Sequence, residues 1–184
     1  MNTQIYFVIG PTASGKSKFA LSLANKFNGE IINADSMQIY SELSILTARP
    51  TLNDHKKINH HLYGFVKGDV RFNVQKWCDE ASKKINYLHD KNITPILVGG
   101  TGLYINSLIS GIVSIPSIPE KVKIESDKII SKIGKKNFFN LVKELDSEAM
   151  INIAPNDIQR IRRIWEVNFF TKKKFSEWKQ NKNK

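Results

Sequence analysis

Cysteine and long apolar runs are both scarce in this chain of 184 residues. Its one cysteine, Cys78, can form neither an internal disulfide nor a cysteine-rich metal site. The longest apolar runs, such as residues 5–9, are far shorter than the roughly 18–20 residues of a membrane span. Residues 1–4 contain no basic, apolar leader of the secretory type. We therefore exclude a disulfide framework and a membrane protein, and we expect a cytoplasmic location.

Acidic residues are few relative to basic ones: 17 Asp and Glu stand against 28 Lys and Arg, for a net charge of +11. Residues 1–120 carry 12 basic and 9 acidic residues, whereas residues 121–184 carry 16 and 8. A positive field concentrated in the last third favours a polyanionic partner. Charge alone leaves open the alternative that these lysines form a solvated surface.

Strand-like and helix-like segments alternate along the first two thirds of the chain. Residues 5–9, 30–34 and 94–98 are short β-branched or apolar runs, typical of strands buried on both faces. Apolar residues recur at helical spacing after residue 17, over residues 73–91 with Asn73 as N-cap, and after Gly102. This alternation predicts an α/β fold with a parallel sheet flanked by helices.

The pattern changes near Gly111, where a proline-punctuated loop leads into lysine-rich helical stretches with weaker periodicity. Asn156 then caps a strongly amphipathic helix. We expect an α/β core over residues 1–113, a small helical insertion over 114–154, and a helix returning to the core, with a polar tail, over 155–184.

Residues 10–17 (GPTASGKS) match the phosphate-binding P-loop pattern G-x-x-x-x-G-K-[ST], between a predicted strand and a predicted helix. Backbone N–H groups of such a loop face phosphate oxygens, the lysine adds a charge, and the hydroxyl of Ser17 can bind Mg²⁺. The fold class is therefore P-loop NTPase-like, although the loop does not distinguish an ATP-binding ATPase or kinase from an enzyme that handles another diphosphate. The predicted diphosphate- or nucleotide-binding residues are Gly10, Pro11, Thr12, Ala13, Ser14, Gly15, Lys16 and Ser17.

Two polar residues follow predicted strands at the edge where ligands bind in open α/β sheets. Asp35 can act there as a base or a metal ligand, or it can cap the next helix. Thr101 lies in a glycine-flanked turn that can approach a bound phosphate, or it simply starts a helix. His60 and His61 lack companions at metal-ligand spacing, so we expect a hydrogen-bonding, structural role for them.

Five further motifs follow the P-loop in order, and together they closely resemble the tRNA dimethylallyltransferase (tRNA isopentenyltransferase) family over essentially the whole chain. Arg49 stands where the family usually has Lys, and Ile164-Trp165 replaces the usual Ala-Leu. The motifs are residues 35–40 (DSMQIY), 47–51 (TARPT), 60–62 (HHL), 98–104 (VGGTGLY) and 155–163 (PNDIQRIRR).

The resemblance implies transfer of a dimethylallyl group from dimethylallyl diphosphate to N6 of the adenine 3′-adjacent to the tRNA anticodon. Lys16 and Mg²⁺ at Ser17 would stabilise the leaving diphosphate. Asp35 would accept the proton of the amine. Thr101 would hydrogen-bond near the reacting oxygen and contact the flipped base. The implied catalytic residues are thus Asp35, Thr101 and Lys16.

The resemblance also implies contacts with the anticodon loop from the α/β core, from the helical insertion over 114–154 and from the helix that follows it. For the arginines, a solvated helix face is the alternative, and one of them can reach the diphosphate instead. For Lys123, too, a solvated surface is the alternative. The implied tRNA-binding residues are Asp35, Ser36, Met37, Gln38, Thr101, Lys123, Gln159, Arg160, Ile161, Arg162 and Arg163.

Length is the main departure from the family, whose members continue well past the segment matching residues 171–177. We therefore expect uncovered apolar surface, marginal stability and weak activity of these 184 residues alone. The expected partners are tRNA and dimethylallyl diphosphate. The chain either associates with a separately encoded C-terminal piece or is a monomer. The alternative functions are a small-molecule P-loop kinase, isopentenyl transfer to a free adenylate, and a non-catalytic remnant that retains phosphate and RNA binding.

Overall fold

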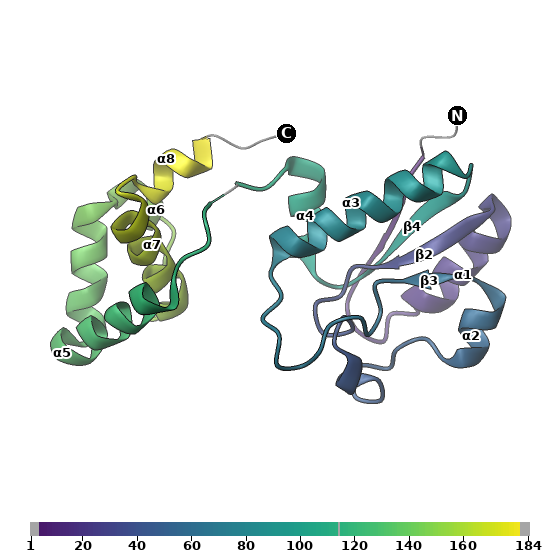
Figure 1. The fold of residues 1–184 in the computed structure, drawn as a ribbon, viewed down its shortest axis with the longest axis horizontal. Helices are drawn as coiled ribbons and strands as arrows, with labels where there is room; N and C mark the ends of the chain where they lie inside the picture. The colour runs from purple at the N-terminus through teal and green to yellow at the C-terminus, as the bar shows by residue number, and fades with distance from the viewer. Residues whose placement is uncertain (1–3, 114, 181–184) are drawn as a thin grey trace. The chain divides into compact units, whose positions relative to one another are not determined.

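The computed structural model describes residues 4–113 and 115–180, which fall into two compact units, Met1–Ser110 and Gly111–Lys184. The first unit is built on a sheet and the second contains only helices among its described residues (Figure 1). None of the helices described has the length and apolar character needed to cross a membrane.

The sheet of the first unit is parallel, in the order β1-β4-β2-β3. Its strands are β1 (Tyr6–Ile9), β2 (Gly29–Asn33), β3 (His60–His61) and β4 (Thr94–Gly99). The predicted α/β class with a parallel sheet is confirmed. β3 was not expected, because two residues are too few to show a periodicity. β1 lies at one edge, and Ile9 at its end is 52% exposed.

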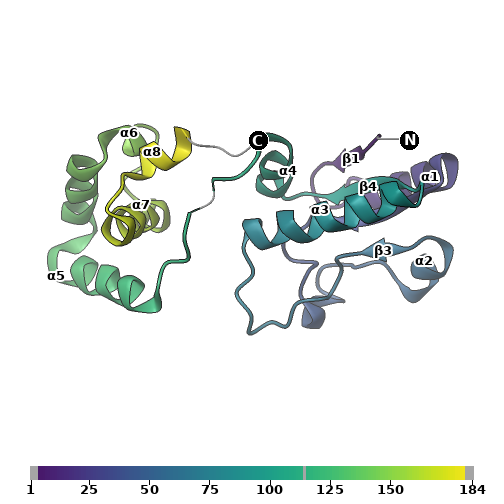
Figure 2. The same cartoon turned by 45° about the horizontal axis from the view of Figure 1, so that its top comes forward.

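Helices cover both faces of this sheet because alternate strand residues point in opposite directions. Ile31 and Ile96 pack toward α1 (Lys16–Phe27), whereas Ile32 and Leu97 pack toward Trp77 on α3 (Val74–Asp90). Accordingly, α1 and α3 lie on opposite sides of β4 (Figure 2). The shorter elements are η1 (Ser41–Leu43), α2 (Leu52–Lys57) and α4 (Gly102–Ser110).

Side-chain hydrogen bonds fix the start of α3 and the position of β3 in the first unit. The side chain of Asn73 accepts a hydrogen bond from the Lys76 N–H, as expected of the N-cap of α3. His60 bonds the Ile58 carbonyl and His61 bonds the Glu30 carboxylate, which ties β3 to β2. The predicted structural role of the two histidines is therefore confirmed.

The second unit comprises α5 (Glu120–Leu145), α6 (Ser147–Met150), α7 (Ile158–Thr171) and α8 (Phe175–Gln180). α5 bends sharply at Gly134, whose φ of 80° lies in the left-handed region that glycine tolerates. Phe138 of α5 packs with Ile161 and Trp165 of α7, and the first two are fully buried.

The two units divide the chain differently from the three predicted segments. Within the second unit, α5 covers the apolar stripe of α7, the helix of the segment predicted over 155–184. The boundary lies after Ser110 rather than after residue 113. The cap of α7 is Asp157, whose side chain accepts a hydrogen bond from the Arg160 N–H, and not Asn156. Residues 181–184 of the predicted tail lie outside the described residues.

A buried carboxylate, Asp146, fastens three helices of the second unit. It is 1% exposed and accepts hydrogen bonds from the backbone N–H groups of Ala149 and Ser176 and from the Asn168 side chain. Burial by itself raises the pKa of this carboxyl, but the hydrogen bonds outweigh burial and lower the pKa below its ordinary value of 3.8. The ionised form therefore stabilises the fold.

We expect Asp146→Ala to lower the free energy of unfolding by about 1–3 kcal/mol at pH 7, because two buried N–H donors lose their acceptor. Since the folded pKa is depressed, this contribution is complete well above pH 3.8 and disappears as the pH falls through the folded pKa. Denaturant unfolding at pH 7 and near pH 3, with exposed Glu144→Ala as control, measures the difference. A difference in the free energy of unfolding between wild type and variant that is the same at both pH values would contradict this account.

Candidate functional site

The loop between β1 and α1 has the backbone expected of a phosphate cradle. Ala13 and Gly15 adopt positive φ angles of 63° and 81°, which turn the chain sharply into the helix. No side chain in the described part of the loop caps α1. The first N–H groups of the helix are therefore open to an anion.

Two polar side chains of this loop are placed to meet a phosphate group. The Lys16 ammonium folds back and donates to the Pro11 carbonyl, so it lies over the loop. Ser17 is exposed on the first turn of α1. No group of three or more His, Cys, Asp or Glu side chains among the described residues could hold a metal. Mg²⁺ at Ser17 would take its other ligands from phosphate oxygens and water, as Mg²⁺ commonly does, and the site fits the ion in that sense.

The ends of β1, β2 and β4 meet at one edge of the sheet. A methyl group placed on Gly100 would lie 3.3 Å from the Gly10 carbonyl oxygen and 4.0 Å from Oδ2 of Asp35. A methyl group on Gly99 would overlap the backbone carbonyl of Ala34. The two glycines thus allow the P-loop, the turn after β2 and the turn after β4 to approach closely.

Asp35 is held so that one of its carboxylate oxygens stays available. Its Oδ1 accepts the Met37 N–H at 2.9 Å, so it caps a turn and not a helix. No hydrogen bond to Oδ2 is found among the described residues, and Oδ2 is the oxygen on the Gly100 side. Thr101 lies beside this turn. Its hydroxyl oxygen accepts the Ser36 N–H at 2.9 Å instead of capping α4.

Asn33 is a site residue that sequence reasoning missed. It is fully buried at the end of β2, where its Oδ1 accepts the Asp35 N–H at 2.9 Å and its Nδ2 donates to the carbonyls of Asp35 and Leu62. Its own carbonyl accepts from the Trp77 indole at 2.9 Å. The available signal was an amide side chain inside a run expected to be buried on both faces. Asn33 fixes the direction in which Asp35 leaves the sheet.

In the second unit, ion pairs occupy several of the predicted tRNA-binding residues. Arg160 pairs with Asp157 at 3.0 Å, and Lys123 pairs with Glu120 at 2.8 Å. Arg162 bridges Asp127 at 2.6 Å and Glu166 at 3.2 Å, which joins α5 to α7. Arg162 therefore has a structural role in this arrangement.

The three remaining residues of the predicted segment over 159–163 differ in exposure: Gln159 and Arg163 are exposed, whereas Ile161 is buried. Helical spacing places the Ile161 side chain on the apolar face with Trp165, where it is fully buried, so a contact of Ile161 with tRNA could involve only its backbone and stays a prediction. Arg163 is exposed, and its side chain makes no ion pair or hydrogen bond within residues 4–113 and 115–180. Of the three arginines, Arg163 is the one whose guanidinium makes no ion pair or hydrogen bond among the described residues, although Glu166 attracts it electrostatically.

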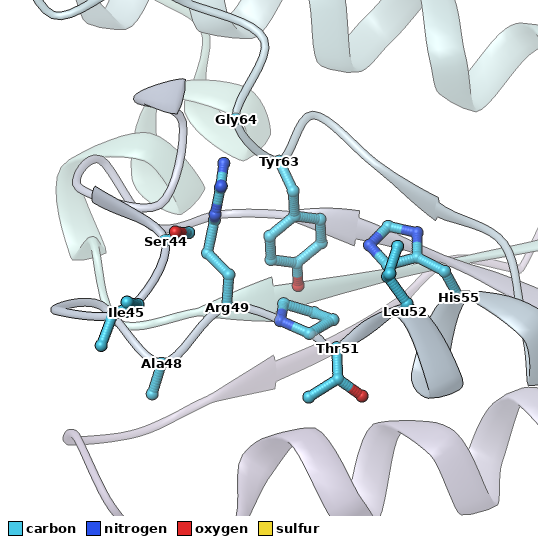
Figure 3. Close-up of a pocket in the computed structure, with 10 residues that line it drawn as sticks. Ser44, Ile45, Ala48, Arg49, Thr51, Leu52, His55, Tyr63 and Gly64 are labelled. Carbon is cyan, nitrogen blue, oxygen red and sulfur yellow. The ribbon is translucent and has the colours of Figure 1, made fainter. Parts of the chain in front are cut away.

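A pocket of about 600 Å³ lies between η1 and α2, lined by residues from Ser44 to Gly64 (Figure 3). Arg49 extends across it toward Gly64 and donates to the carbonyls of Tyr40 and Ser41 at 3.3 and 3.1 Å. Gly64 has a φ of 57°, and any side chain there would collide with this guanidinium. Arg49, the predicted departure from the family pattern, thus organises the loop. Asp35 and Thr101 are not among the described residues that line the pocket.

A P-loop at the end of β1, with a carboxylate after β2 and a hydroxyl after β4, defines an α/β protein with a candidate phosphate site at the carboxyl edge of its sheet. A sequence model described as IPP transferase matches residues 38–184, and one described as isopentenyl transferase matches residues 3–71. The chain belongs to the IPP transferase family.

Relatives and solved structures agree with this assignment. The chain is 46% identical to a tRNA dimethylallyltransferase of Pelagibacter ubique, covering 96% of the chain and 56% of the relative, and 42% identical to one of Bartonella henselae, covering 97% and 61%. A structure of a eukaryotic dimethylallyltransferase acting on tRNA has a TM-score of 0.82 at 30% identity, covering 97% of this chain and 44% of that one. A tRNA isopentenylpyrophosphate transferase from Bacillus halodurans has a TM-score of 0.59 at 32% identity, covering 92% and 56%.

This chain therefore spans only a little more than half the length of these two curated relatives.

Proposed function

We propose that this chain carries the catalytic site of a tRNA dimethylallyltransferase, which transfers a dimethylallyl group from dimethylallyl diphosphate to N6 of the adenine 3′-adjacent to the anticodon. The observation that supports it most is the juxtaposition of the P-loop with the Asp35 carboxylate around Gly100. A diphosphate in the loop would have its leaving oxygen on the same sheet edge as a free carboxylate oxygen. The names of the relatives supply the identity of the transferred group and of the acceptor.

The reaction assigns a distinct task to each group at this edge. N6 of adenine attacks C1 of the dimethylallyl group, the C1–O bond breaks, and diphosphate leaves with the electron pair. The Asp35 Oδ2 takes the N6 proton, since Oδ1 is already bound to the Met37 N–H. Thr101 holds the Ser36 turn in place, and its hydroxyl lies beside the path of the base.

Stabilisation of the leaving diphosphate falls to the P-loop. The open N–H groups at the start of α1 and the Lys16 ammonium face the charge that develops as the C1–O bond breaks. Mg²⁺, held by Ser17 together with diphosphate oxygens, supplies further charge neutralisation when bound.

The acceptor adenine must leave its stack to reach this edge, as in other base-modifying enzymes. Residues 36–38 form the turn beside Asp35 and are partly or fully exposed, so they can contact the displaced base or its neighbours. In the second unit, exposed Arg163, which has no ion pair or hydrogen bond among the described residues, can bind an RNA phosphate.

The direct test is to incubate the protein with dimethylallyl diphosphate, Mg²⁺ and unmodified tRNA, and to analyse the nucleosides by mass. Dimethylallylated adenosine at the position following the anticodon is the expected product. ATP-dependent phosphorylation of a small molecule, with no modified nucleoside, would favour a kinase instead. Binding of both substrates without any product would indicate a non-catalytic protein.

We expect Lys16→Ala to weaken diphosphate binding by about 1–3 kcal/mol, the range for a hydrogen bond that involves a charged group. Isothermal titration calorimetry with inorganic diphosphate and Mg²⁺ measures the change. Lys18→Ala is the matched control, because Lys18 is an exposed lysine of the same helix. Equal affinities of the Lys16 variant and wild type would remove the P-loop lysine from the site.

A further inference from the structure

The turn between α7 and α8 concentrates positive charge on the second unit. It carries three consecutive lysines, and a fourth follows on α8. No carboxylate lies within ion-pairing distance of any of the four among the described residues, unlike Lys123 and Arg162 of the same unit. We call this set the α7–α8 basic turn: Lys172, Lys173, Lys174 and Lys179.

Aromatic rings hold three of these lysines in place. The ammonium of Lys172 lies 4.6 Å from the centre of the Phe169 ring, that of Lys173 lies 4.9 Å from the Trp178 ring, and that of Lys179 lies 5.2 Å from the Phe175 ring. Such cation–π contacts restrict the side chains but leave the N–H groups on the outer side free. The entropy lost when these lysines bind an anion is correspondingly smaller.

The backbone of the basic turn is equally well fixed. The Asn168 side chain accepts the Phe175 N–H at 2.6 Å, and buried Asp146 accepts the Ser176 N–H at 3.0 Å. The Thr171 hydroxyl accepts from the Trp178 indole at 3.3 Å and donates to the Val167 carbonyl at 2.8 Å. These contacts stabilise the second unit, and they also hold the backbone that carries the lysines in a fixed conformation.

We propose that the α7–α8 basic turn binds the phosphodiester backbone of RNA. Lysines that follow one another in sequence and have no acidic partner among the described residues suit contacts with several phosphates, and such contacts are independent of base sequence. This inference rests on the proposed function for the identity of the RNA, which is tRNA. It adds a contact surface separate from the Arg160–Arg163 segment.

The test compares two triple variants that remove the same charge from the same unit. The first is Lys172→Gln with Lys173→Gln and Lys174→Gln. The control is Lys132→Gln with Lys135→Gln and Lys136→Gln, exposed lysines of α5 that contact no aromatic ring or carboxylate among the described residues. Affinity for unmodified tRNA is measured by filter binding over a range of salt concentrations, and transfer activity is assayed in parallel.

The log–log salt slope of the basic-turn variant should fall by about 0.7–0.9 for each phosphate that its side chains no longer neutralise, while the slope of the control stays at the wild-type value. Equal slopes for all three proteins, or equal decreases in both variants, would overturn the inference. Wild type that binds tRNA through these lysines but transfers nothing would overturn the proposed function alone. Wild type without affinity for tRNA would overturn both.

Discussion

Asp35→Asn should slow dimethylallyl transfer by about 10²–10⁴-fold, the usual contribution of a positioned general base. The amide oxygen of asparagine can still accept the Met37 N–H, so the turn after β2 should keep its shape. What the variant loses is the carboxylate oxygen next to Gly100, the proposed proton acceptor. The binding of diphosphate and tRNA should therefore change little.

Single-turnover measurement of the transfer rate, with saturating protein, separates chemistry from binding in this variant. Asp69→Asn serves as control, because Asp69 is an exposed carboxylate in a loop of the same unit. A normal rate for Asp35→Asn would end its assignment as the base. A normal rate combined with weakened tRNA binding would leave it a contact residue only.

The features that can be predicted from the amino-acid sequence are those encoded locally or by topology. The P-loop is a contiguous motif, so residues 10–17 can be identified from the order of their side chains alone. Asp35 and Thr101 can be placed at the same edge because parallel strands end together there. The distance between Asp35 and the P-loop cannot be predicted in this way, since it depends on the close approach at Gly99 and Gly100.

The features that escape prediction depend on partners far away in sequence. Arg162 has its near partner, Glu166, one helical turn away, but its shorter contact is to Asp127, on another helix. By sequence, an arginine held in this way is indistinguishable from a neighbouring one that is available to RNA. Asn33 escapes for a related reason: its importance lies in bonds to Leu62 and Trp77, which no local pattern connects to it.

The second large effect is expected from Gly99→Ala, a change of one methyl group. Gly99 ends β4, and its neighbour across the sheet is the backbone of Ala34, which no side-chain rotation can move away. The added Cβ must push β2 from β4 or tilt the turn that carries Asp35. We expect the free energy of unfolding to fall by about 3 kcal/mol or more, at or above the upper end of the range for overpacked sites.

Gly102→Ala is the matched control, because a methyl group there would meet no atom within 4 Å and Gly102 begins helix α4. That variant should unfold at or slightly above the wild-type denaturant concentration, since alanine is the better helix former. Chemical denaturation of both variants gives the stability difference, and the transfer assay gives its effect on the site. Because Asp35 directly follows Ala34, whatever fraction of Gly99→Ala remains folded should also transfer more slowly than wild type. Two variants of equal stability would mean that the strands can separate at little cost, and that the glycine is not what sets the distance between Asp35 and the P-loop.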